Sequence, residues 1–373
     1  MADFLSENKL TKWLLDGYDG WSHTRFPGGG KINYAEVIKQ TDRYLNQHVH
    51  KNVETGAAAR ELGLFLTDHG PDHIRMVIRR AEKLLGKAQL TNEGREKESG
   101  VLEPYEVFLL VAAIHFHDVG NWYGREGHEK RIIDVMAKVP TFMELDRFEQ
   151  GLIARIAASH GGRINGNPNT IGRLPETEKS GDISYRPRLI AAILRLADEL
   201  ADERSRASQF GLQNPDDFPN CLIYHKYAFS LSSVDVEPTN QQLELRFQIS
   251  QVDASVTFPI FRNGNDEPVK IYLLDYIYER TLKTYREMFY CSQFMRELYC
   301  QFHQVAVRID ALCDAVDFEP VETISYRIGE IGYPDDNHGT LMSLAPRHEN
   351  APNGASMAEI LATKCKQSAS CAI

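Results

Sequence analysis

The chain has 373 residues, of which 42% are hydrophobic and 25% are charged, as in an ordinary globular protein with one large or two modest domains. Because a chain of this length buries roughly three quarters of its unfolded surface, it needs neither a metal nor a disulfide merely to form a core. Its 42 Lys and Arg against 52 Asp and Glu give a net charge of −10, which argues against broad electrostatic attraction to nucleic acid.

The sequence shows no membrane, secretion or disulfide signal. The opening MADFLSENKL lacks a basic segment followed by an apolar one, and no stretch approaches the roughly 18 consecutive apolar residues of a membrane span. The six cysteines form no CxxC pair, and the final SASCAI does not place Cys where a prenylation signal needs it. We therefore expect a cytoplasmic protein with reduced thiols and no membrane partner.

Hydrophobic periodicity predicts a mainly α fold with a small β insert. Apolar residues recur every three or four positions up to about residue 208, β-branched and aromatic runs follow, and helical periodicity then returns. We interpret this as a helical bundle with a small antiparallel β insert and additional C-terminal helices. The predicted parts are a helical extension (1–50), a metal-binding helical domain (51–210), an α+β region (211–330, strands about 221–261, helices about 269–314, a further strand about 321–328) and an irregular tail (331–373).

Histidine and aspartate side chains fall repeatedly on the apolar faces or at the ends of the predicted helices. In PDHIRMVIRRAEKLL, His73 is in line with the apolar stripe, and in EPYEVFLLVAAIHFHDVGN the stripe leads directly to His117 and Asp118. In LIARIAASHGG a histidine ends a helix, and in RPRLIAAILRLADEL an aspartate lies on the apolar face. With the histidine that opens HEKRIIDVMAKV, the candidate ligands are His73, His117, Asp118, His128, His160 and Asp198.

Six such groups in one helical interior favour a shared cation. A single buried histidine is ordinarily a core residue, but several imidazoles and two carboxylates together cost several kcal/mol for each uncompensated group. A divalent cation offsets that cost, and imidazole with carboxylate suits Mn, Fe, Co, Ni or Zn rather than Ca. We predict one or two divalent ions, of Mn, Fe, Mg, Co, Ni or Zn.

The order His, His-Asp, Asp on successive helices resembles the HD superfamily of metal-dependent phosphohydrolases, and the resemblance implies an HD-type helical bundle. The matching segments are DHGPDHIRMVI, LLVAAIHFHDVGN and ILRLADELADERSR, over roughly residues 50 to 208. The resemblance implies hydrolysis of a phosphoester or phosphoanhydride bond of a nucleotide, or of a nucleotide-derived signal, by a metal-activated water. The two extra histidines resemble the binuclear branch. There Asp118 would bridge, with His73, His117 and Asp198 on one metal and His128 and His160 on the other.

One departure concerns the cation that many binuclear members carry in HDxGK, because this chain has Asn121 in HDVGN. Flanking charges are candidate replacements, although each could equally be a solvated surface charge. The aromatic that follows Asn121 could stack on a nucleobase or form a packed lid. We predict Arg125 and Lys130 to act with Asp118 in catalysis, and Arg131, Arg163, Asp202 and Trp122 to bind substrate.

The sequence is also compatible with other functions. The ligand order also resembles the di-iron oxygenases of the HD group, such as myo-inositol oxygenase, and the bundle could be a non-catalytic metal-binding or nucleotide-binding sensor. A nuclease is disfavoured by the acidic balance. The aromatic-rich later helices suggest a homodimer.

Overall fold

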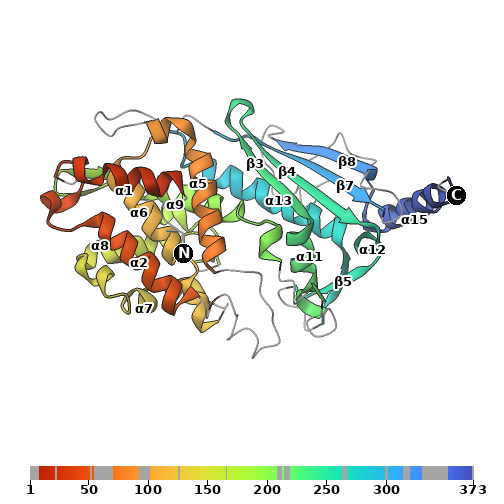
Figure 1. Ribbon diagram of the computed structural model, residues 1–373, viewed down its shortest axis with the longest axis horizontal. Helices are drawn as coiled ribbons and strands as arrows, with labels where there is room; N and C mark the ends of the chain where they lie inside the picture. The colour runs from red at the N-terminus through yellow and green to blue at the C-terminus, as the bar shows by residue number, and fades with distance from the viewer. Residues whose placement is uncertain are drawn as a thin grey trace. The chain divides into compact units, whose positions relative to one another are not determined.

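The structure is a computed structural model in which the chain forms two compact units (Figure 1). We call the first, Met1–Leu62, Asp68–Ala201 and Tyr290–Gln301, the helical unit. The second, Gly63–Thr67, Asp202–Phe289 and Phe302–Ile373, is the mixed unit. The structure describes residues 8–21, 23–50, 53, 70–91, 101–124, 127–164, 166–207, 212–213, 219–262, 267–298, 301–313, 320–329 and 352–371.

The helical unit is built around one helix that is buried on every side. This helix, α6 (Pro104–Phe116), consists of thirteen residues, all of them buried. It begins with proline in its first turn and a capping box between Glu103 and Glu106, which together fix its start. The surrounding helices are α1 (Lys9–Trp21), α2 (Tyr34–His48), α5 (Pro71–Thr91), α7 (Ile132–Met136), α8 (Arg147–Ala158) and α9 (Pro187–Glu199), with a short hairpin of β1 (Glu178–Ser180) and β2 (Ile183–Tyr185).

A buried ion pair fixes the start of α9 against the start of α6. Arg186, the residue before α9, donates from Nε to Glu106 Oε1 at 2.9 Å and from Nη2 to Glu106 Oε2 at 2.7 Å. Its Nη2 also donates to the carbonyl of Val101 at 2.8 Å. Glu106 is 1% exposed, so its charge depends on these partners. The contact fixes two helices that lead to predicted metal ligands.

Replacing Arg186 by Met should therefore destabilise the protein strongly. The change leaves the buried Glu106 charge without its cation, and breaking such a pair costs about 3–5 kcal/mol. Chemical denaturation followed by circular dichroism would show the loss as a lower midpoint. The double variant R186M/E106L removes both charges and should regain part of that stability. A single variant that unfolds at the wild-type midpoint would show that the pair does not hold the two helices together.

The mixed unit contains a four-stranded sheet in the order β3-β4-β7-β8. Strands β4 and β7 pair in parallel, and the outer pairings are antiparallel. The strands are β3 (Leu231–Glu237), β4 (Gln242–Ser250), β7 (Gln304–Leu312) and β8 (Pro320–Gly329); a separate antiparallel hairpin joins β5 (Thr257–Ile260) to β6 (Val269–Tyr272). The helices are α11 (Leu222–Ser230), α12 (Gln251–Ala254), α13 (Leu273–Ser292, whose last three residues belong to the helical unit) and α15 (Gly354–Cys371).

Aromatic side chains join the helices of the mixed unit to its sheet. Thr281 on α13 shares a 2.8 Å hydrogen bond with the hydroxyl of Tyr326 on β8. Tyr227 on α11 lies with its ring 5.6 Å from that of Phe247 on β4. Two helices therefore pack on this sheet and bury its apolar side chains.

The predicted mainly α fold with a small β insert is confirmed, with several local differences. The run LIYHKYAFS, predicted as strand, is helix α11, because a short apolar run has no period that separates the two states. Residues 304–312, predicted as helix, form β7, in which Val305, Val307 and Ile309 are buried at a spacing of two. Residues 269–272 likewise form β6, and helix α15 occupies part of the predicted irregular tail.

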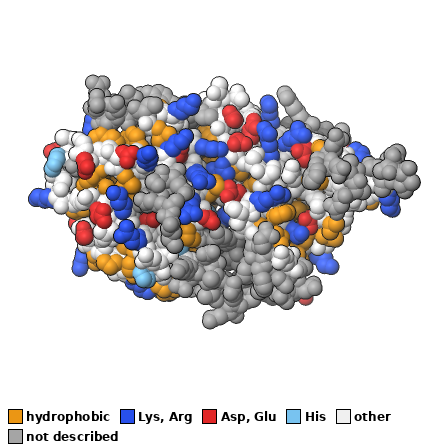
Figure 2. All heavy atoms as spheres, in the orientation of Figure 1, with side chains coloured by type: hydrophobic (Ala, Val, Ile, Leu, Met, Phe, Trp, Pro, Cys, Tyr) orange, Lys and Arg blue, Asp and Glu red, His pale blue; other side chains and the backbone are white. Residues whose placement is uncertain are grey.

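Charged side chains are spread over the visible surface (Figure 2), and the described helices are too polar or too short to cross a membrane. Among the described residues on the face in Figure 2, acidic and basic side chains are interspersed. The excess of acidic residues is therefore not gathered into one field on that face. No helix in the described parts of the chain is long and apolar enough to span a membrane.

Candidate metal centre

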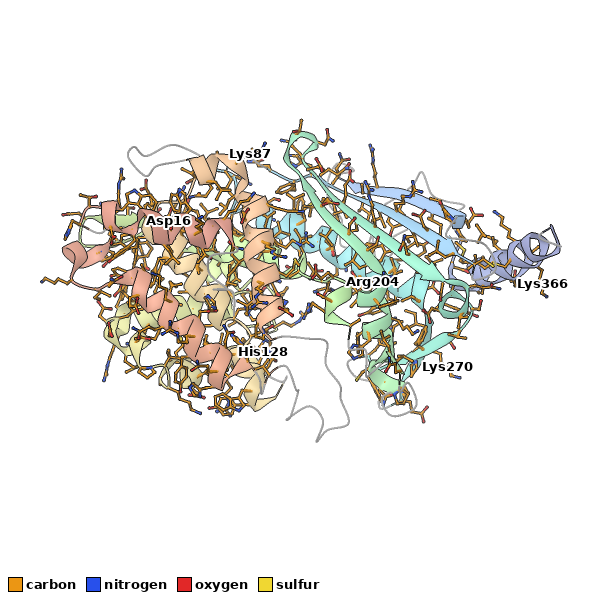
Figure 3. The ribbon with its side chains drawn as sticks, in the orientation of Figure 1. Asp16, Lys87, His128, Arg204, Lys270 and Lys366 are labelled. Carbon is orange, nitrogen blue, oxygen red and sulfur yellow. The ribbon has the colours of Figure 1, made fainter. Side chains whose placement is uncertain are left out.

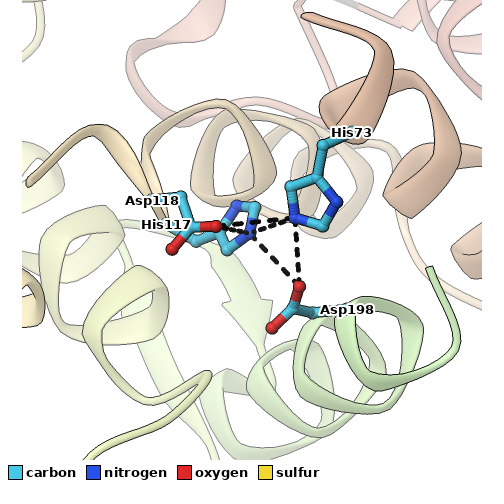
Figure 4. Close-up of side chains that lie close together, drawn as sticks. All are labelled: His73, His117, Asp118 and Asp198. Carbon is cyan, nitrogen blue, oxygen red and sulfur yellow. Dashed lines mark hydrogen bonds and ion pairs between the residues drawn. The ribbon is translucent and has the colours of Figure 1, made fainter. Parts of the chain in front are cut away.

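Three helices bring four predicted ligands to one point inside the helical unit (Figure 4). His73 lies on α5, His117 and Asp118 follow the end of α6, and Asp198 lies in the last turn of α9. The apolar stripes of α5 and α9 face the core, and α6 is buried on every side, so each of the three helices carries a polar residue of this cluster inward. The two histidines are completely buried, Asp118 is nearly so, and the Asp198 side chain is 24% exposed.

Five of the six spacings between the donor atoms of this first cluster are nearly equal. His73 Nε2 lies 3.2 Å from His117 Nε2, 3.2 Å from Asp198 Oδ1 and 3.5 Å from Asp118 Oδ2. His117 Nε2 lies 3.4 Å from Asp118 Oδ2 and 3.5 Å from Asp198 Oδ1. Metal–ligand bonds of about 2.1 Å arranged tetrahedrally put neighbouring ligand atoms about 3.4 Å apart. The spacing therefore fits a cage around one cation.

A second cluster shares Asp118 with the first. His128, labelled in Figure 3, begins the short 3-10 helix η4 (His128–Lys130), and His160 follows the end of α8. Their Nε2 atoms lie 3.3 Å apart, at 3.3 Å and 3.7 Å from Asp118 Oδ1. The carboxylate of Asp118 thus turns Oδ2 toward the first cluster and Oδ1 toward the second.

Backbone contacts orient two of the imidazoles for metal binding. His117 Nδ1 lies 2.7 Å from the carbonyl of Ile114, and His160 Nδ1 lies 2.7 Å from the carbonyl of Ala157. A carbonyl can only accept, so Nδ1 carries the proton and, in the neutral ring, Nε2 keeps its lone pair. This is the ring orientation and tautomer that a metal-ligating histidine requires.

The electrostatics of the clusters also suit a cation. Burial alone would lower the pKa of His117, but the carboxylates of Asp118 and Asp198 raise that pKa to about 10. Burial alone would raise the pKa of Asp198, but hydrogen bonds with His117 and His73 hold it well below its usual value. Burial and the neighbouring His117 lower the pKa of His160 to about 4, so this ring is neutral at pH 7. The carboxylates of the clusters therefore favour a positive charge beside them, and the residues fit a divalent metal.

Among the described residues of the helical unit, two further buried histidines lie outside the clusters. Burial lowers the pKa of His50 to about 3 and that of His115 to about 4, in each case helped by the charge of a neighbouring histidine. His115 Nδ1 lies 3.9 Å from Asp42 Oδ1. Both rings are neutral at pH 7 and add no positive charge beside the clusters.

Asn121 contacts the shared carboxylate, a role that the sequence analysis did not assign. Its Nδ2 donates to Asp118 Oδ1 at 3.0 Å, and the side chain is buried. The 3-10 helix η3 (Val119–Tyr123) has three residues per turn, which places residue 121 above residue 118. That spacing was the signal available in HDVGN. The asparagine at the position of the lysine in HDxGK therefore orients Asp118.

Three of the four predicted substrate-binding and catalytic cations are exposed and do not join the clusters. Lys130 and Arg131 are exposed, and Arg131 pairs with Asp134 at 3.3 Å. Arg163 is also exposed and donates to the carbonyl of Gly166 at 3.0 Å. The predicted catalytic Arg125 lies outside the described residues.

The predicted Asp202 begins the mixed unit and makes ion pairs there. It accepts from Arg206, and from Arg280 Nη2 at 2.9 Å. Both of its carboxylate oxygens are therefore engaged by arginines of the mixed unit, so the structure does not assign it to the metal clusters.

The predicted Trp122 belongs to an aromatic group just after Asp118. Its ring stacks on that of Tyr123 with centroids 6.0 Å apart. Lys138 Nζ lies 4.6 Å from the Trp122 ring centroid and donates to the Tyr123 hydroxyl at 2.8 Å. The lysine therefore covers the indole through a cation–π contact.

Comparison with known proteins gives one family. The HD-CE family, an HD-type family, matches residues 62–279, which is more than half of the chain and includes all six candidate ligands. No curated protein and no solved structure gives a significant match. The match and the buried His/Asp clusters agree, and the chain belongs to the HD-CE family.

Proposed function

We propose that this protein is a metal-dependent phosphohydrolase that uses a binuclear centre to cleave a phosphoester or phosphoanhydride bond of a nucleotide or nucleotide-derived signal. The observation that carries the proposal is the carboxylate of Asp118. Its two oxygens face different sets of histidines, at 3.4–3.5 Å for Oδ2 and 3.3–3.7 Å for Oδ1. A carboxylate turned to two donor sets in this way suits a bridging ligand.

Divalent cations held by these residues would lower the pKa of bound water toward neutrality and neutralise charge on a phosphoryl group. One ion would be held by His73, His117 and Asp198, the other by His128 and His160, and both by Asp118. The chain's own contribution is orientation. Backbone carbonyls fix two imidazoles, and the Asn121 amide fixes the shared carboxylate. Fixed ligands bind the ions without reorganising during the reaction.

Substrate recognition is assigned to the segment that surrounds His128 in the sequence. Lys130 and Arg131 are exposed cations next to a candidate ligand and could pair with phosphate oxygens. Trp122 would stack on a base once Lys138 moved off its ring. Arg163, two residues beyond the glycine that follows His160, is a further cation for phosphate.

A phosphate-release screen tests the proposal. Purified protein is incubated with nucleoside mono-, di- and triphosphates and cyclic nucleotides in the presence of Mn²⁺, Mg²⁺, Co²⁺ or Fe²⁺, and products are resolved by chromatography. We expect metal-dependent hydrolysis that H73A abolishes and that H48A retains, since His48 is an exposed histidine of the same unit. Bound iron with oxygen consumption and no hydrolysis would contradict the proposal and favour an HD-type oxygenase. Metal binding without turnover would favour a sensor.

A further inference from the structure

A buried arginine on the Asp198 helix contacts the loop that follows His160. Arg195 lies three residues before Asp198 on α9 and is 7% exposed. Its Nη1 donates to Thr170 Oγ1 at 2.9 Å and to the carbonyl of Pro168 at 3.3 Å. Its guanidinium carbon lies 4.9 Å from the centroid of the Tyr290 ring, a cation–π distance. The arginine is therefore held in one place.

The hydroxyl of Thr170 connects Arg195 to the peptide bond before His160 by a second hydrogen bond. Thr170 Oγ1 accepts from Arg195 and donates to the carbonyl of Ser159 at 2.9 Å. That carbonyl belongs to the peptide bond that joins Ser159 to His160. Thr170 and Ser159 are both buried, and a donor that is itself polarised by a charged group makes a stronger hydrogen bond.

The N–H of the same peptide donates to the carbonyl of Ala157 at 3.3 Å, which leaves the Ser159 carbonyl to be fixed by Thr170. Residues 163–164 and 166–169 are exposed, so these residues of the loop have little core packing. The contact of His160 Nδ1 with the Ala157 carbonyl fixes the rotation of the ring relative to α8. The contact from Thr170 fixes the backbone that carries the ring. The two contacts act on different parts of the same residue.

We propose that Arg195 and Thr170 are positioning residues that connect the helix of Asp198 to His160, so that binding of a cation at the second cluster depends on this hydrogen-bonded chain. The inference rests on the proposed binuclear function. Arg195 connects the two clusters. Its own helix supplies Asp198 to the first cluster, and its hydrogen bonds through Thr170 reach the backbone next to His160 in the second.

Titration of the metal-free protein with Mn²⁺, followed by calorimetry and by metal analysis after desalting, tests this inference. Thr170→Val keeps the side-chain shape but removes the hydroxyl. Loss of an outer-shell partner typically weakens metal binding about 10–100-fold. We expect that loss at one of two sites, with the other unchanged, and recovery in Thr170→Ser. Arg195→Lys should show a smaller loss at the same site.

The matched control is Arg188→Met. Arg188 lies on the same helix and contacts the far end of the same loop, through the carbonyls of Leu174 at 2.6 Å and Gly172 at 3.1 Å, but it does not reach Thr170. It should retain both Mn²⁺ sites.

Three outcomes would decide against the inference or its premise. Two sites of wild-type affinity in Thr170→Val would overturn the inference and leave the proposed function standing. If Thr170→Val and Arg188→Met both weakened the two sites equally, the hydrogen bonds of Arg195 and Thr170 would contribute only to overall stability, and the inference would also be overturned. Fewer than two ions in the wild-type protein would contradict the binuclear function itself.

Discussion

Replacing Asp118 by Asn is expected to weaken both metal sites at once. The change keeps the size of the side chain but removes its charge and turns one of two ligand oxygens into an amide nitrogen. Because Oδ2 faces His73 and His117 and Oδ1 faces His128 and His160, neither cluster keeps its full donor set. We expect each site to bind Mn²⁺ at least about 100-fold more weakly, and hydrolysis to be lost.

The control for this prediction is His160→Ala, which removes a donor from the second cluster only. It should lower the Mn²⁺ content, measured by elemental analysis after desalting, by one ion per chain, whereas Asp118→Asn should lower it by two. The shared role of Asp118 would be refuted by a D118N protein that still holds one ion as tightly as wild type.

The second large effect is expected from Gly120→Ala, through contact with the backbone of η4. A β-carbon at residue 120 would lie 1.9 Å from the carbonyl oxygen of His128 and 2.7 Å from its carbonyl carbon. Backbone atoms cannot turn aside as a flexible side chain can, so η4 must move. We expect overpacking to cost about 1–3 kcal/mol or more and the displaced His128 to lose its place 3.3 Å from Asp118.

Gly151→Ala is the matched control for this substitution, because Gly151 lies within α8 and a β-carbon there would meet nothing within 4 Å. It should be neutral or stabilising by about 0.5–1 kcal/mol. Thermal unfolding and Mn²⁺ titration of both variants check the prediction. Unchanged unfolding and full metal binding in Gly120→Ala would show that η3 and η4 are not packed as closely as described.

The convergence of the ligands was predictable because the period of an α-helix and the position of its apolar stripe determine which side chains face the core. His73 and Asp198 continue such stripes, His117 follows a helix that is buried on every side, and the structure brings the three together. His128 has no long stripe to orient it, since it begins a three-residue 3-10 helix. Its place beside Asp118 depends on the contact of η4 with Gly120, which no local pattern reveals.

Other features depend on contacts between residues distant in the sequence. Thr170 meets Arg195 across 25 positions, and no sequence motif marks the pair. The same limit explains the error over residues 222–230, where a short apolar run was predicted as strand and forms α11. In contrast, the sequence QVAVRIDAL alternates apolar and other residues, a local pattern that favours the strand β7 over the predicted helix.

The central claim is that the His/Asp clusters hold divalent metal ions. Its most direct test is a crystal structure of the wild-type protein grown with Mn²⁺, with an anomalous difference map recorded at the manganese absorption edge. We predict one peak among His73, His117, Asp118 and Asp198, and a second among Asp118, His128 and His160. A map with no peak at either cluster, from protein saturated with Mn²⁺, would contradict the claim.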